Sequence, residues 1–149
     1  MRGQHVSIRP ISTADFAAWN RLWQDYLRFY RADLPEQTTL TTFERLVAQT
    51  GGAFGLVADD DDHELVGLAH LIFHTSTWSI QPYCYLEDLF VSPAARGTGT
   101  ATRLITAAYD EADRRGAART YWHTQEYNSS ARSLYDQLAH PTSFRVYER

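Results

Sequence analysis

The first half of the chain shows three hydrophobic patterns in succession. Residues 5–9 alternate between polar and apolar, which predicts a short strand that ends at Pro10. From Asp15 to about Arg31, apolar side chains recur at the spacing of one helical face, in a stripe of Trp19, Leu22, Trp23, Tyr26, Leu27 and Tyr30. We expect this stripe to pack in the core, with the alternative that Tyr26 or Tyr30 touches a substrate. A second, short helix is expected at 42–49.

The middle of the chain predicts a β-hairpin followed by a buried strand. Two extended runs, at 53–58 and 65–74, flank the acidic segment 59–63, whose composition is typical of a solvated turn. Residues 83–91 are nearly all apolar or aromatic, as in a central strand that is covered on both faces. Two adjacent carboxylates interrupt this run, and they are the first candidates for chemistry.

Two helices and two strands are predicted in the last third of the chain. A glycine turn at 97–99 opens a helix that ends at Gly116, with a buried stripe of Ala101, Leu104, Ile105, Ala108 and Ala112. Residues 120–124 are predicted to form a strand. Asn128 suits the cap of a last helix that runs to about Leu138, and 144–147 is expected to be a final strand. This mixture of helices and strands predicts an α/β (α+β) fold.

Composition narrows the cellular setting and the partners. The chain has 149 residues, of which 44% are hydrophobic, and we expect a single domain over 1–149. A formal charge of −4, with arginines spread along the chain, argues against a nucleic-acid partner. We expect no membrane span and no secretory leader, and the lone Cys84 suits a reducing, cytoplasmic location. His70 and His74 share a strand face, but with no third ligand nearby we expect no metal site.

The segment from Leu86 to Ala101 combines a strand that carries carboxylates with a glycine turn that opens a helix. A turn without Cβ atoms lets backbone N–H groups approach a phosphate, and the helix N-terminus adds partial positive charge. A phosphate-bearing cofactor is therefore expected. A P-loop is excluded because the chain has no lysine, and the glycine pattern of a dinucleotide-binding fold is absent.

The turn residues Arg96-Gly97-Thr98-Gly99-Thr100-Ala101 fit the signature Arg/Gln-x-x-Gly-x-Gly/Ala, and the chain resembles the Gcn5-related N-acetyltransferase (GNAT) superfamily over essentially its whole length. The resemblance implies a single mixed, mostly antiparallel sheet that is flanked by helices and splayed at the acetyl-CoA site. It implies acetyl-CoA as co-substrate, with its pyrophosphate on the N–H groups of 96–101 and its pantetheine along the strand that ends at Val91. The implied cofactor-binding residues are Leu89, Phe90, Val91, Arg96, Gly97, Thr98, Gly99, Thr100, Ala101 and Asn128.

Acyl transfer to an amine needs a base, and Glu87 is the favoured candidate. In regular strand order Glu87 shares a face with Tyr85, whereas Asp88 points the other way with Leu86 and Phe90, unless a bulge intervenes. Burial beside apolar side chains raises the pKa of a carboxyl group towards neutral pH, which suits a base that acts directly or through water. For either carboxylate the alternative is a structural one, namely a pair with an arginine or a cap on a loop.

Four other residues complete the list of candidates. The resemblance implies that Tyr135 protonates the coenzyme A thiolate and that a backbone N–H at a bulge near 89–91 stabilises the oxyanion; a core tyrosine is the alternative. Asn128 suits both a helix cap and a hydrogen bond to the cofactor. His123 is an alternative base, whereas Cys84 is not favoured as a nucleophile because no base is paired with it.

The expected acceptor substrate rests on the resemblance alone. The strand Tyr-Leu-Glu-Asp-Leu-Phe-Val is similar to that of the yeast histone/polyamine and D-amino-acid acetyltransferase branch and of diamine acetyltransferases. This implies transfer to the primary amine of a small amine, polyamine or amino acid through a ternary complex. A protein lysine or N-terminus is the alternative acceptor, and a non-catalytic acyl-CoA sensor or another nucleotide-binding protein is the alternative function. The resemblance also suggests a homodimer that pairs or exchanges the segment 144–147.

Overall fold

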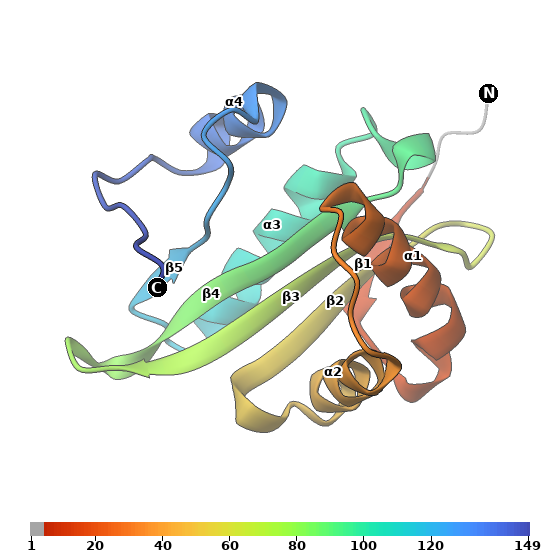
Figure 1. Ribbon diagram of the computed structural model, residues 1–149, viewed down its shortest axis with the longest axis horizontal. Coiled ribbons are helices and arrows are strands. Elements are labelled where there is room, and N and C mark those ends of the chain that lie inside the picture. Colours follow the sequence, from red (N-terminus) through yellow and green to blue (C-terminus); the bar gives the residue numbers. More distant parts are fainter. Residues whose placement is uncertain (1–4) are drawn as a thin grey trace.

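A five-stranded sheet forms the centre of the part of the chain that the computed structural model describes, which is residues 5–149 (Figure 1). The first four residues of the expected domain 1–149 lie outside that part. The strands are β1 (Ser7–Pro10), β2 (Ala53–Asp59), β3 (Leu65–Ser76), β4 (Ser79–Val91) and β5 (Arg119–Tyr121). They lie in sequence order, β1 to β4 are antiparallel neighbours, and β5 runs parallel to β4 at the edge. The expected mixed, mostly antiparallel sheet is confirmed.

Helices cover both faces of the sheet. The helices α1 (Phe16–Phe29) and α2 (Glu36–Ala48) lie over one face, and α3 (Thr100–Arg114) lies over the other (Figure 1). The helix α4 (Ser129–Leu138) packs near α3, since the hydroxyl of Tyr109 donates to the carbonyl of Leu138 at 2.9 Å. None of the helices in residues 5–149 is long and apolar enough to cross a bilayer.

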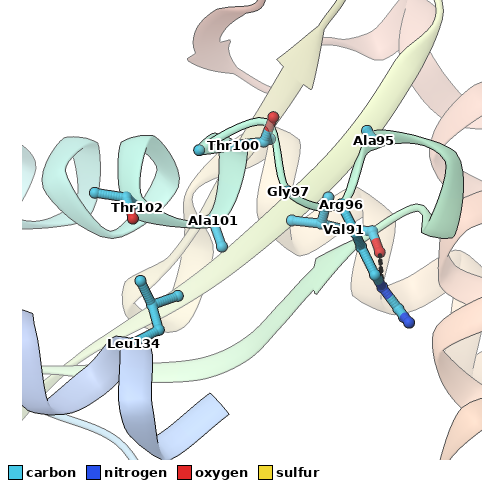
Figure 2. Close-up of a pocket in the computed structure, with 9 residues that line it drawn as sticks. Val91, Ala95, Arg96, Gly97, Thr100, Ala101, Thr102 and Leu134 are labelled. Carbon is cyan, nitrogen blue, oxygen red and sulfur yellow. Dashed lines mark hydrogen bonds between the residues drawn. The ribbon is translucent and has the colours of Figure 1, made fainter. Parts of the chain in front are cut away.

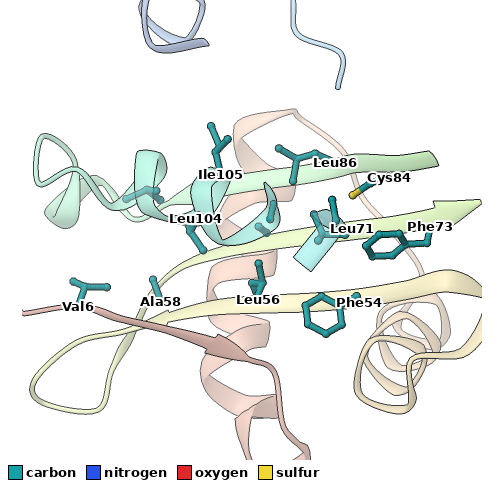
Figure 3. Close-up of a cluster of buried hydrophobic side chains, with 14 of the residues drawn as sticks. Val6, Phe54, Leu56, Ala58, Leu71, Phe73, Cys84, Leu86, Leu104 and Ile105 are labelled. Carbon is teal, nitrogen blue, oxygen red and sulfur yellow. The ribbon is translucent and has the colours of Figure 1, made fainter. Parts of the chain in front are cut away.

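Two hydrophobic cores hold these layers together. Under α3, Leu104 and Ile105 are fully buried against strand residues such as Leu71 and Leu86, which project towards the helix (Figure 3). Under α1 and α2, the first part of the predicted stripe and Leu27 are buried, and the rings of Trp19 and Trp23 stack with centroids 5.6 Å apart. Tyr26 is only partly buried and Tyr30 is exposed, so the expectation that the whole stripe packs in the core is wrong for Tyr30. Apolar area removed from water contributes roughly 25 cal/mol per Å², so these faces fix the helices on the sheet.

Several elements differ from the sequence prediction. The strand expected at 120–124 is the short β5, and β4 begins at Ser79 instead of residue 83. The helix α2 begins at Glu36 instead of residue 42, because the carbonyl of Pro35 accepts from the N–H groups of Thr38 and Thr39 in a first turn that is almost wholly polar. The predicted strand at 144–147 is wrong. That segment joins no strand of the sheet, and its side chains are exposed, with Tyr147 at 93%.

A β-bulge at Glu87 changes which faces the carboxylates occupy. His70 on β3 pairs with Asp88, but the next residue, Leu71, pairs with Leu86, so Glu87 is the extra residue. Leu86 consequently belongs to the core under α3, while Phe90 belongs to the core under α1. The prediction that Asp88 and Phe90 share a face with Leu86 is therefore wrong, because the bulge reverses the alternation.

The sheet opens between β4 and β5 beyond Tyr85. The parallel pairing of these strands covers three residue pairs and ends at Tyr85 with Tyr121, whereas β4 continues to Val91. The last six residues of β4, from Leu86 to Val91, thus lack a strand partner on that side, as expected for a sheet that is splayed at the site.

Candidate active site

The glycine turn between β4 and α3 forms a concave loop of backbone N–H groups. After a short 3-10 turn (Pro93–Ala95), Gly97 and Gly99 adopt φ angles of +78° and +81°, and Gly99 is the N-cap of α3. The loop is held from inside, because the Thr98 hydroxyl lies 2.8 Å from that of Thr100 and also bonds the carbonyl of Ala95. The left-handed conformation at the two glycines turns successive N–H groups the same way.

The loop has the properties of an anion site. The backbone N–H groups of residues 97–102 donate to no backbone acceptor within residues 5–149, and a Cβ built on Gly97 or Gly99 would meet no atom within 4 Å. Beside the loop lies a cavity of about 260 Å³, which Figure 2 shows between the start of α3 and Leu134 of α4. Free N–H donors, a helix N-terminus and open space together fit a pyrophosphate group.

A larger cavity of about 420 Å³ continues from the loop into the opening of the sheet. It lies between α1, the end of β4 and α4, and it shares Val91, Arg96 and Gly97 with the first cavity. Arg96 joins the two regions, since its Nε donates to the carbonyl of Val91 at 3.3 Å. All the residues expected to bind the cofactor except Thr98 line one or both cavities.

The N–H groups of residues 89–91, which were expected near the oxyanion, point in two directions because of the register of β4. The N–H of Ser92 donates to Val66 of β3, and alternation in an antiparallel ladder then directs the N–H of Phe90 to β3 as well. The N–H groups of Leu89 and Val91 consequently face the edge that β5 leaves open.

Glu87 lies at the bulge, two residues before Leu89, and its side chain reaches solvent. Partial burial and, next, the charge of Asp88 raise the pKa of its carboxyl group, while Tyr85 and His123 oppose the shift. The predicted direction of the pKa shift is therefore confirmed, although Glu87 is less buried than the strand pattern indicated. His123, the alternative base, has its Nδ1 3.1 Å from the hydroxyl of Tyr85.

Asp88 is paired with another side chain, but the partner is His70 instead of the arginine that the structural alternative named. Its Oδ2 lies 2.8 Å from Nδ1 of His70, and its side chain is 15% exposed. On its other side lies Tyr26, whose pKa is raised by burial and by the Asp88 charge. Sequence reasoning missed this arrangement, because no motif connects residues of three separate elements.

Tyr135 projects from α4 into the larger cavity. Its ring packs edge-on against Trp122 at 5.3 Å, and burial raises the pKa of its hydroxyl group, with a smaller contribution from Tyr30. Tyr26 and Tyr30 of α1 line the same cavity, so the alternative that they reach a ligand is compatible with their positions.

Of the two remaining candidates, Asn128 lies at the site and Cys84 lies in the hydrophobic core. Asn128 is the N-cap of α4, where its Oδ1 accepts from the N–H of Ala131 at 3.4 Å, and it also lines the larger cavity. Cys84 is fully buried in the core under α3, and burial raises the pKa of its thiol to about 11. A protonated thiol in the core cannot attack a substrate, which agrees with the sequence interpretation.

Comparisons with known proteins agree with this geometry. Residues 19–139 match the model of the acetyltransferase (GNAT) family. The chain is 33% identical over 150 residues to D-amino-acid N-acetyltransferase HPA3 of Saccharomyces cerevisiae, covering all of this chain and 93% of that one. It is 34% identical over 132 residues to the uncharacterised N-acetyltransferase YhfO of Bacillus subtilis, covering 89% and 87%. The structure of aminoglycoside N-acetyltransferase AAC(6')-Iy in complex with CoA superposes with a TM-score of 0.85 at 22% identity, covering 99% of this chain and 96% of that one.

Proposed function

Because the chain belongs to the acetyltransferase (GNAT) family and is an acetyl-CoA-dependent N-acetyltransferase, we propose that it acetylates the primary amine of a small molecule by direct attack within a ternary complex. The acceptor class proposed is a small amine, a polyamine or an amino acid. The relative HPA3 supports a small acceptor, since its name gives D-amino acids as substrates and it aligns with the whole chain.

One observation carries the proposal. The two adjoining cavities lead from the N–H loop at Gly97–Ala101, past the open edge at Leu89 and Val91, to Tyr135. Acetyl-CoA, when bound, supplies an activated acetyl thioester. The loop residues would hold its pyrophosphate, and the N–H of Leu89 or that of Val91 would donate to the thioester oxygen as negative charge develops there.

Two side chains move protons in the proposed reaction. Glu87 takes a proton from the acceptor ammonium, directly or through a water molecule, so that the amine becomes a nucleophile. Tyr135 donates its proton to the sulfur that leaves, a role for which a raised pKa keeps the hydroxyl protonated. The carboxyl groups of Glu87 and Asp88 lie side by side at the bulge of β4, where the acceptor is proposed to bind, and this favours acceptors that carry positive charge.

An acceptor screen tests the proposed substrate class. Purified protein and acetyl-CoA are incubated with polyamines, L- and D-amino acids, aminoglycosides and lysine-containing peptides, and CoA release and product mass are measured. We expect one of the small-molecule classes to give product in equal amount to the CoA released. Acetylation confined to the peptides would overturn the proposed acceptor class and leave the transferase activity intact.

The homodimer and the cytoplasmic location that were expected from the sequence are also proposals. The side chains of Phe144, Val146 and Tyr147 in the C-terminal segment are exposed, and pairing with the same segment of a second copy would cover them. Light scattering after gel filtration tests the homodimer, since a monomer mass at micromolar concentration would contradict it. The proposed cytoplasmic location follows from the reducing setting that the lone cysteine suggests.

A further inference from the structure

A buried chain of hydrogen bonds leads from α1 through β3 to the carboxylate next to Glu87. The indole N–H of Trp19 donates to Nε2 of His70 at 3.0 Å, and Nδ1 of His70 lies 2.8 Å from Oδ2 of Asp88. Trp19 is fully buried and His70 is 2% exposed. Three separate elements, α1, β3 and β4, thus meet in one polar contact beside the bulge at Glu87.

The donors and acceptors in this chain fix the state of the imidazole. An indole nitrogen can only donate, so Nε2 of His70 must present a lone pair and carries no proton. The proton of the neutral ring is therefore on Nδ1, where it is donated to Asp88. A neutral ring that donates to the carboxylate stabilises its ionised form without cancelling its charge.

We propose that Trp19 and His70 are positioning residues for the transfer reaction, because together they hold the Asp88 carboxylate ionised and fixed beside Glu87, the proposed base. The proposal rests on the proposed role of Glu87 as base. Asp88 then supplies a fixed negative charge that keeps the base reactive near neutral pH and attracts a cationic acceptor.

The bulge at Glu87 places the carboxylate of Asp88 where it can act on Glu87. Without it the two carboxylates would project from opposite faces of β4, whereas the register shift brings Asp88 to the α1 side, against His70. The charge of Asp88 raises the pKa of Glu87, so that the carboxylate of Glu87 is more basic when it is ionised. The titratable groups around Glu87 are Asp88 and Tyr85 on β4, His70 on β3, Tyr121 on β5, His123 after β5 and Tyr26 on α1.

The stacked pair of tryptophans offers a matched control. Trp23 stacks on Trp19 and lies with its ring centroid 5.3 Å from that of His70, but its indole N–H donates to the hydroxyl of Thr39. Trp23→Phe and Trp19→Phe therefore remove the same group from the same core. Only Trp19→Phe removes the indole N–H that donates to Nε2 of His70.

The first test reads the tautomer directly, without any assay of activity. Two-bond proton–nitrogen correlation spectra are recorded on protein labelled with ¹⁵N-histidine, and the His70 signals are assigned with His70→Asn. We expect an Nδ1–H tautomer at neutral pH, with an Nε2 shift that changes in Trp19→Phe and is retained in Trp23→Phe. An Nε2–H tautomer or an imidazolium at neutral pH would overturn the proposal.

The second test separates positioning from a merely structural role. Activity of a proton-accepting Glu87 rises with pH, so kcat/KM has an acid limb that follows the pKa of Glu87. Asp88→Asn removes the charge and keeps the shape, and we expect that limb to move to lower pH while maximal kcat/KM falls. His70→Phe removes the imidazole N–H that donates to Asp88, and we expect the acid limb to move to lower pH in this variant as well. His70→Asn places an amide N–H where Nδ1 was and is expected to restore the wild-type profile.

The outcomes distinguish this proposal from the role of Glu87 itself. If all variants lose stability by thermal unfolding but keep the wild-type pH profile, His70 is a structural residue and the proposal fails. If Glu87→Gln also keeps the wild-type acid limb, the base has been misassigned and the proposed function fails at that residue. The Asp88→Asn variant is close in size and shape to the parent, so a folded protein is available even where His70→Phe does not fold.

Discussion

Replacing Gly99 with alanine tests whether the turn before α3 holds the cofactor pyrophosphate. Gly99 has a φ of +81°, and a Cβ built there would meet no atom within 4 Å. The cost to the folded protein is thus one of backbone conformation alone, about 1–2 kcal/mol for an L-residue in the left-handed region. The variant should fold, with a lower midpoint of unfolding.

The effect on acetyl-CoA binding is expected to be larger than this strain. A backbone that relaxes at residue 99 turns its N–H groups away from the phosphate position, and a hydrogen bond to a charged group contributes about 1.5–3 kcal/mol. Loss of one such bond corresponds to about a ten- to hundredfold increase in Kd, since a tenfold change in Kd equals about 1.4 kcal/mol. Isothermal titration calorimetry with CoA measures this change.

Gly51 provides the matched control for the same substitution. Its φ is +64°, a Cβ there also meets nothing within 4 Å, and it lies in a turn before β2 that lines neither cavity. Gly51→Ala should lower stability by a similar amount and leave the Kd for CoA unchanged. The reasoning is refuted if both variants weaken CoA binding equally, or if Gly99→Ala binds CoA as tightly as the parent.

Three further substitutions test other parts of the structure. Tyr135→Phe keeps the packing against Trp122, so we expect kcat to fall about tenfold or more and the Kd for CoA to stay within about twofold, as measured by steady-state kinetics and calorimetry. Gly52→Ala would place a Cβ 1.9 Å from the carbonyl oxygen of Phe73, and urea unfolding should show a loss of about 3 kcal/mol or more. Asn128→Ala removes the cap of α4, with an expected loss of about 1 kcal/mol in the same assay.

Local sequence signals predicted most of the elements and the cofactor loop. The apolar stripes of α1 and α3 each follow one helical face over about three turns, so that periodicity alone located both helices. The left-handed glycines at 97 and 99 were predictable because the conformation that an anion loop requires is one that glycine adopts at little cost. The start of α2 was missed because its first turn is polar and gives no apolar period.

Features that depend on pairing between distant segments were not predictable in the same way. The resemblance implied a bulge near 89–91, but its position at Glu87 is a property of the register between β3 and β4, and no residue of β4 signals it by type. The same holds for the bond between His70 and Asp88, since two strands and a helix must first assemble. The segment 144–147 has the composition of a strand, but a strand needs a partner edge, and residues 5–149 provide none that it uses.

The pH dependence of the Glu87→Gln variant tests the central claim most directly. Glutamine keeps the size of the side chain and cannot accept the proton, so kcat/KM for the best acceptor should fall by about 10²-fold or more. The acid limb of the profile, which the raised pKa of Glu87 places above that of an ordinary carboxyl group, should disappear, while the Kd for CoA stays unchanged. A variant with the parental rate and the parental acid limb would contradict the account.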